Sequence, residues 1–180
     1  MADKFYYFVS GDLVRKCTMR ESSSNDDIVY IRFLDEEDRG LIFEHIVFRS
    51  SLYEELAEAE LIADFVRDSY KGFTRVPRVP ARFLKEHKAE LLEIQDRLFK
   101  ELKNLHSVSF TYNGDHITVE CYHKEIPMES LGCFAFLLPD FSNKDSVIED
   151  LIEWWIGSDT PSNIKDIKRI AAEYNEYGCD

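Results

Sequence analysis

Two consecutive Arg-Val-Pro triplets, at residues 75–80, constrain what this chain can fold into more than any other feature of its sequence. Each valine precedes a proline, and the proline ring disfavours helical backbone angles at the residue before it. We therefore expect residues 71–80 to be extended. They divide the chain into a first part rich in strand patterns and a second part that opens with a long helical pattern.

The first fifty residues predict an antiparallel meander. Stretches rich in β-branched and aromatic residues alternate with polar turns, and both faces of the third and fourth stretches carry bulky apolar residues, so we expect cover on each face. A helix should follow directly, because Ser51 and Glu54 have the spacing of a capping box and apolar residues continue at helical intervals to Tyr70. The four expected strands cover residues 5–9, 13–20, 28–34 and 41–48.

After the connector, apolar residues recur every three or four positions and predict one long helix over 81–105. Residues 107–123 then alternate between apolar and polar around Asn113 and Gly114, the pair that best tolerates a two-residue type I′ turn. We expect a hairpin there, with Phe110 paired with Ile117.

A buried strand over 131–138 and two helices, over 142–156 and 160–177, complete the pattern. Strands, helices, strands and helices in this order predict the α+β class. We expect an antiparallel N-terminal meander and a second, hairpin-based sheet, packed with about four helices of which one is long. The 180 residues, 44% of them hydrophobic, suffice for one sizeable core, so residues 1–180 are predicted to form a single domain.

The formal net charge of −13 is unevenly distributed along the chain. Residues 1–70 carry 8 Lys/Arg against 16 Asp/Glu, residues 71–105 carry 9 against 5, and residues 106–180 carry 5 against 14. Such acidity argues against direct contact with nucleic acid or an anionic membrane, since both need a positive protein surface. It favours a basic protein, or a nucleic-acid-binding protein, as the partner.

The positive segment between the two acidic arms is predicted to neutralise acidic surface of the same chain or of a second copy, which makes a homo-oligomer possible. Its basic residues are Lys71, Arg75, Arg78, Arg82, Lys85 and Lys88. The N-terminus has no signal-peptide core or membrane span, so we expect an intracellular, cytoplasmic protein. No CxxC pair occurs among the four cysteines, and reduced thiols are expected.

No phosphate-binding glycine loop, nucleophile elbow or HExxH motif is present, and we expect no cofactor. One alternative would make the chain a Cys/His-dependent enzyme or a zinc-binding protein. The expected hairpin register places His106 opposite Cys121, with His123 two residues further along the same face, and two imidazoles with a thiol can begin a zinc site or form a nucleophile pair. The other interpretation of these three residues is a buried thiol with two histidines at a sheet end.

The remaining candidate is a run of carboxylates, Asp35, Glu36, Glu37 and Asp38, which together with Asp26 and Asp27 would present a negative surface at one sheet edge. Trp154 points away from the apolar stripe of its helix and could anchor an interface. The sequence thus predicts a small acidic binding protein of bacterial or phage type, an inhibitor, immunity or adaptor protein rather than an enzyme, which occludes a basic surface of its partner. A self-associating structural protein is the third possibility.

Overall fold

The computed structural model describes residues 4–41, 43–69 and 75–177, with side chains up to residue 173. These residues fall into two compact units, each described by itself below. The N-terminal unit contains residues 4–69 and 76–88, and the C-terminal unit contains residue 75 and residues 89–177. The single domain stays a prediction.

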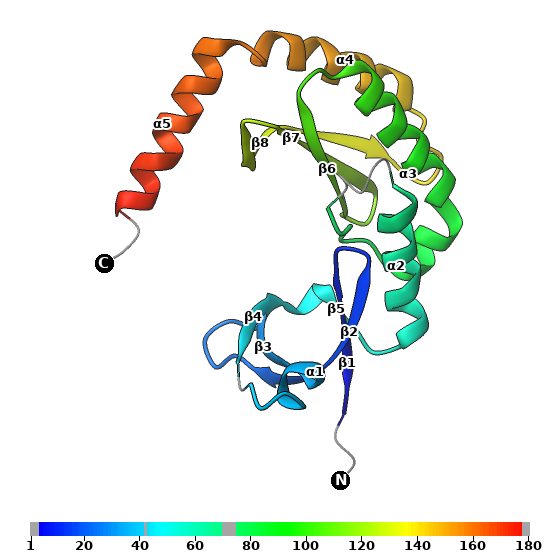
Figure 1. Cartoon of the computed structure of the whole chain (residues 1–180). Coiled ribbons are helices and arrows are strands. Elements are labelled where there is room, and N and C mark those ends of the chain that lie inside the picture. The colour runs from blue at the N-terminus through cyan, green and yellow to red at the C-terminus, as the bar shows by residue number, and fades with distance from the viewer. Residues whose placement is uncertain (1–3, 42, 70–74, 178–180) are drawn as a thin grey trace. The chain divides into compact units, whose positions relative to one another are not determined.

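The N-terminal unit is built on a five-stranded antiparallel sheet with the order β4-β3-β2-β1-β5 (Figure 1). Its core is a cluster of fully or nearly fully buried side chains from β2 and β3, extended by partly buried residues of β1, β2, β4 and β5. Cys17, Val29, Ile31 and Phe33 form that cluster. The strands are β1 (Tyr6–Ser10), β2 (Leu13–Glu21), β3 (Ile28–Phe33), β4 (His45–Phe48) and β5 (Leu52–Tyr53).

The meander is confirmed, but the expected capping box at Ser51 is wrong. Ser51 ends a 3-10 turn, η1 (Arg49–Ser51), and Leu52 then pairs with Phe8 of β1. Pairing with β1 extends the sheet by one strand, which outweighs the local cap signal. The helix α2 (Leu56–Asp68) starts only after this strand and has no side-chain cap.

The connector and the long helix follow the prediction where the structure describes them. Residues 75–80 contain no helix, and residues 71–74 of the predicted extended segment lie outside the described residues. Helix α3 (Ala81–Glu101) then begins directly after the second proline of the connector. Its backbone departs from helical geometry at His87, one residue before the last residue assigned to the N-terminal unit.

The C-terminal unit contains a three-stranded antiparallel sheet in the order β6-β7-β8, formed by β6 (Leu105–Tyr112), β7 (His116–His123) and β8 (Ile126–Leu137). The hairpin is confirmed and its register is corrected: Phe110 pairs with Val119, not with Ile117. The reason lies in the turn, where the Asn113 amide donates to the His116 carbonyl at 2.9 Å and Gly114 adopts a positive φ of 93°. The two-residue loop is therefore Gly114-Asp115, one position later than predicted.

Helix α4 (Lys144–Ser158) packs on β8, and α5 (Pro161–Tyr177) continues from it after a bend (Figure 1). Thr160 accepts the Asn163 amide at 3.3 Å, as expected for the N-cap of α5. A single turn of helix, α1 (Leu34–Glu37), connects β3 to β4. With two antiparallel sheets and these helices, the predicted α+β class is confirmed. No helix in the described part of the chain is long and apolar enough to cross a membrane.

Candidate functional site

The predicted acidic run forms α1 and the turn after it, and two of its four carboxylates share one cation from β2. The Arg15 guanidinium lies 2.8 Å from Asp35 Oδ1 and 3.0 Å from Glu36 Oε1. It also stacks on the Phe33 ring, with 3.5 Å between the guanidinium carbon and the ring centroid. Hydrogen bonding to Arg15 lowers the pKa of Asp35.

Glu36 has a second partner on β4. His45 Nε2 lies 2.9 Å from Glu36 Oε2, and this hydrogen bond, followed by that from Arg15, holds the Glu36 pKa below its ordinary value. The same imidazole packs against Phe33 with 5.0 Å between ring centroids. Asp35 and Glu36 thus fasten α1 to the sheet, although 52% of the Asp35 side chain stays exposed, against 18% of that of Glu36.

Glu37 and Asp38, by contrast, are exposed, and no described cation forms an ion pair with either carboxylate. Asp26 and Asp27 are exposed as well and lie at the other end of β3, next to β4, where Arg49 N donates to the Asp27 carbonyl. Residues 21–49 carry eight Asp/Glu against three Arg, a net charge of −5. The carboxylates therefore flank both ends of the β3–β4 pair.

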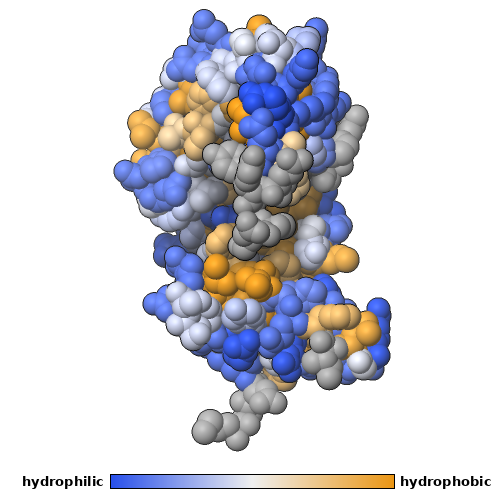
Figure 2. Space-filling view, turned by 90° about the vertical axis from the view of Figure 1, so that its left-hand side faces the viewer, coloured by the Kyte–Doolittle hydropathy of each residue, from blue (hydrophilic) through white to orange (hydrophobic). Residues whose placement is uncertain are grey.

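Between these carboxylates lies an apolar surface that the sequence patterns did not lead us to expect. Cover was expected on both faces of the fourth strand, yet Phe43, Ile46 and Phe48 are 56%, 66% and 47% exposed. Ile46 and Phe48 share one face of β4, while the alternate residue Val47 packs on the core cluster. Figure 2 shows hydrophobic atoms among hydrophilic ones in the lower part of the view, where the N-terminal unit lies.

This apolar surface also lies at a sheet edge. β4 is the last strand in the order, and no other strand in the described part of the chain pairs with its outer side. We refer to the exposed carboxylates Glu37 and Asp38 together with Phe43, Ile46 and Phe48 as the β4 surface. It combines negative charge, exposed aromatic rings and an open strand edge, a combination common in protein-binding sites.

Trp154, the other predicted contact residue, belongs to the C-terminal unit. Its side chain is 42% exposed, whereas that of Trp155 is only 2% exposed, so its outward direction is as expected. Part of its ring packs edge-on against Phe134, with 6.0 Å between centroids, and over Gly132, where an added Cβ would lie 2.9 Å from the indole. Trp154 therefore has a packing role on β8. The other four predicted contact residues, Asp35 to Asp38, belong to the N-terminal unit, so neither unit contains all five.

The predicted grouping of His106, Cys121 and His123 does not form. Val108, not His106, lies opposite Cys121, because the turn shift moves the register and a bulge falls at His106. Cys121 is 1% exposed, and burial raises the pKa of its thiol to about 12. Among the described residues, no three His, Cys, Asp or Glu side chains lie close enough together to hold a metal ion.

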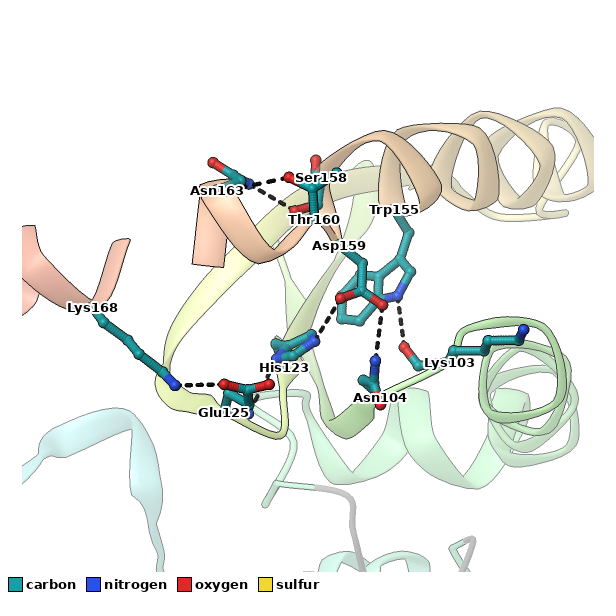
Figure 3. A network of polar contacts seen from close by, with 10 residues as sticks. All are labelled: Lys103, Asn104, His123, Glu125, Trp155, Ser158, Asp159, Thr160, Asn163 and Lys168. Atoms are coloured by element: carbon teal, nitrogen blue, oxygen red, sulfur yellow. Dashed lines mark hydrogen bonds and ion pairs between the residues drawn. The ribbon is translucent and has the colours of Figure 1, made fainter. Parts of the chain in front are cut away.

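His123 instead takes part in a polar network that joins β7 to the α4–α5 corner (Figure 3). Its ring is 1% exposed, and its Nδ1 accepts the Glu125 amide at 3.1 Å, so Nε2 carries the proton and donates to Asp159 Oδ1 at 2.9 Å. Asn104, in a left-handed conformation with φ of 60°, donates to the other Asp159 oxygen at 3.0 Å. Trp155 Nε1 donates to the Lys103 carbonyl nearby, at 2.8 Å.

The Asp159 carboxylate borders a cavity of about 400 Å³ on the surface of the C-terminal unit. Its lining combines two carboxylates and two ammonium groups with apolar side chains. Glu125 and Lys168, both in this lining, form an ion pair. The lining residues are Asn104, Glu125, Asp159, Pro161, Ile164, Lys165 and Lys168. Sequence reasoning missed this cavity, because Asn104, His123 and Asp159 lie far apart along the chain and share no spacing motif.

Four residues of the basic segment contact side chains of their own unit, two of them through carboxylates, and the predicted neutralisation of acidic surface stays a prediction. Each cation named here lies against a carboxylate or an aromatic ring of its own unit, and Lys71 lies outside the described residues. The pairs are Arg82 with Glu86, Lys88 with Asp68, Arg78 with the Phe48 ring, and Arg75 with the Tyr122 ring. The homo-oligomer stays a prediction.

Comparison of the chain with protein-family models, with curated proteins and with solved structures finds no match in any of the three. The functional argument therefore depends on the chemistry of these surfaces alone.

Proposed function

We propose that this protein is a small binding module whose β4 surface occludes a basic surface of a partner protein. The observation that carries the proposal is that two exposed carboxylates without described ion pairs, Glu37 and Asp38, stand in the connection that leads into the edge strand β4, where three apolar side chains are exposed. An isolated acidic loop is usually only solvated. Carboxylates bordering exposed aromatic rings supply both parts of an interface, a desolvated apolar centre and a charged rim that steers the partner.

An inhibitor, immunity protein or adaptor would use this surface in the same physical way. The partner's basic groups would approach Glu37 and Asp38, while its apolar groups would cover Phe43 and Ile46. Asp35 and Glu36 would contribute to the field but not to direct contact, because Arg15 and His45 already occupy their oxygens.

The test compares two charge-reversal variants of equal charge change. Glu37→Lys with Asp38→Lys removes the two exposed carboxylates of the β4 surface. Glu149→Lys with Asp150→Lys makes the same change at two exposed neighbours on α4, in the other unit. Each immobilised protein is incubated with native lysate at about 30 mM and about 300 mM salt, and retained proteins are identified, purified and titrated.

Support would be a partner with a basic surface whose affinity falls at least tenfold with salt and with the β4 variant, but less than twofold with the α4 variant. The proposal is wrong if every retained protein binds both variants equally, or if its affinity is unaffected by salt.

The cavity beside Asp159 makes small-molecule binding the second candidate function. The group that would bind the ligand is then the Asp159 carboxylate, which the buried His123 orients, and not the predicted Cys121 thiol. A carboxylate, Asp159, and an ammonium group, Lys165, in one lining would suit a small amino acid or another zwitterion. Titration of the amide NMR spectrum with a mixture of free amino acids tests this candidate. Saturable shifts confined to the cavity residues and abolished by Lys165→Ala would support it, and their absence would eliminate it.

A further inference from the structure

The β4 surface sits among aromatic rings that already hold guanidinium groups. Arg15 lies over Phe33 at 3.5 Å, Arg20 lies over Tyr30 at 4.4 Å, and Arg78 lies over Phe48 at 4.7 Å. The three rings belong to β3 and β4, so this part of the sheet binds arginine repeatedly. Two lysine ammonium groups also lie over rings of this unit, over Phe5 at 3.9 Å and over Tyr6 at 5.1 Å, but both rings are at the start of β1 or directly before it, rather than on β3 or β4.

Two of these guanidinium groups are also clamped by carboxylates. Arg15 bonds both Asp35 and Glu36, and Arg20 Nη2 lies 3.0 Å from Glu44. Stacking uses the flat face of the guanidinium and ion pairing uses its edge, so both contacts form at once. An ammonium group has no planar edge and face to divide in this way.

Phe43 is the exposed aromatic residue of this surface over which no described cation lies. Its ring is 56% exposed and it precedes β4 by two residues. Glu37 and Asp38 stand a few residues earlier in the same connection, which folds back on itself because Leu41 N donates to the Glu36 carbonyl at 3.0 Å. One connection thus supplies both a ring and two carboxylates with no described cation partner; its own Arg39 is exposed, and no described ion pair or ring contact involves it.

We infer that the partner inserts an arginine side chain between Phe43 and the Glu37–Asp38 carboxylates, and that the β4 surface recognises an extended, arginine-bearing segment of a partner protein. This inference rests on the proposed function and specifies it. The β4 surface would recognise arginine side chains of the partner's basic surface rather than positive charge in general. Charge complementarity favours this occupant over the β4 surface of a second copy of the chain, which carries the same negative charge.

The test uses three synthetic peptides that alternate threonine with arginine, lysine or glutamate, titrated into the full chain by calorimetry and NMR. We expect the arginine peptide to bind at least fivefold more tightly than the lysine peptide, and the glutamate peptide not to bind. Arginine side-chain protons should shift upfield when they stack on a ring.

Phe43→Leu keeps an exposed apolar side chain and removes the ring face. It should reduce the affinity for the arginine peptide to that of the lysine peptide, leave the lysine peptide within twofold, and abolish the upfield shift. The amide spectrum confirms that the variant folds.

The outcomes separate the two proposals. Equal affinity for the arginine and lysine peptides, both lost in the Glu37→Lys/Asp38→Lys variant, overturns the arginine inference and leaves the acidic binding function standing. No binding of either basic peptide overturns the inference, and the lysate comparison then decides the function alone. A dimer of the free chain that is disrupted by Phe43→Leu would also overturn the inference, since a second copy would then occupy the surface.

Discussion

The buried His123–Asp159 pair offers the sharpest quantitative test of the structure. Asp159→Ala removes the acceptor of the His123 Nε2 proton, which lies 2.9 Å from Oδ1 inside a site where the ring is 1% exposed. Asp159 borders the surface cavity, so water can enter the vacated space, but it replaces a charged acceptor of the imidazole N–H with a neutral one. The exposed Asn104 amide, by contrast, can turn towards solvent at little cost.

The loss of a buried hydrogen bond to a charged group costs about 1.5–3 kcal/mol, and we expect a decrease in the free energy of unfolding of about 2 kcal/mol. Asp159→Asn retains a carbonyl oxygen that can accept the His123 proton but loses the charge, so its cost should be about 1 kcal/mol. The order of the two variants follows from the geometry and is more diagnostic than either value.

Urea unfolding followed by tryptophan fluorescence is the appropriate assay. The chain has two tryptophans, Trp154 and Trp155, and both lie on α4, so the signal follows the C-terminal unit alone. A double-mutant cycle with His123→Ala measures the coupling between the two side chains, which should be at least about 1 kcal/mol. If Asp159→Ala costs less than about 0.5 kcal/mol, or if the two substitutions are additive, the network does not hold the α4–α5 corner as described.

Further expectations follow from other parts of the fold. Alkylation at pH 8 should modify the exposed Cys133 in the native protein and spare Cys121, whose buried thiol has a pKa of about 12; fast labelling of Cys121 would contradict its burial. Gly114→Ala should lower the free energy of unfolding by about 1–2 kcal/mol. The cost is conformational, because φ is 93° and no atom lies near the added methyl group. Gly157→Ala, in a helix with equally open space, is the control and should not destabilise the protein; equal effects of the two substitutions would refute the turn assignment. Glu36 has a folded-state pKa below its ordinary value of 4.5, so its contribution to stability is present above pH 4.5 and is lost as the pH falls through the folded value. Glu36→Gln should therefore flatten the acid limb of the stability profile measured by circular dichroism, and an unchanged limb would exclude the pairing.

The elements that alternation and capping signals can specify were predicted well. The hairpin, the meander and the Thr160 cap each depend on residues close in sequence, and each is present. The turn register was missed by one position because Asn113 can either enter the loop or close it. In the structure it closes the loop, and its side-chain amide bonds Thr118 Oγ1 at 2.6 Å, a contact that exists only after the strands have paired.

Elements that depend on distant partners were not predictable in this way. β5 has two residues, too few for alternation to be visible, and it exists because Leu52 finds Phe8 of β1. The His123–Asp159 pair spans 36 positions, and neither residue has a local signal for it. A histidine at the end of a strand and an aspartate between two helices are both common in surface turns.

The charge pattern illustrates the same limit and shapes the functional argument. In the sequence, the four carboxylates of Asp35 to Asp38 are indistinguishable. In the structure Arg15, twenty positions before Asp35, binds Asp35 and Glu36 but not Glu37 or Asp38. Asp35 and Glu36 bond to side chains of the sheet, whereas no described cation pairs with Glu37 or Asp38. The same arginine also stacks on Phe33, so Arg15 shows within this fold how one guanidinium contacts a ring and carboxylates at once. We propose the same arrangement for a partner's arginine at Phe43. A sequence can reveal that a surface is acidic; only the pairing of its carboxylates reveals which of them a partner can still reach.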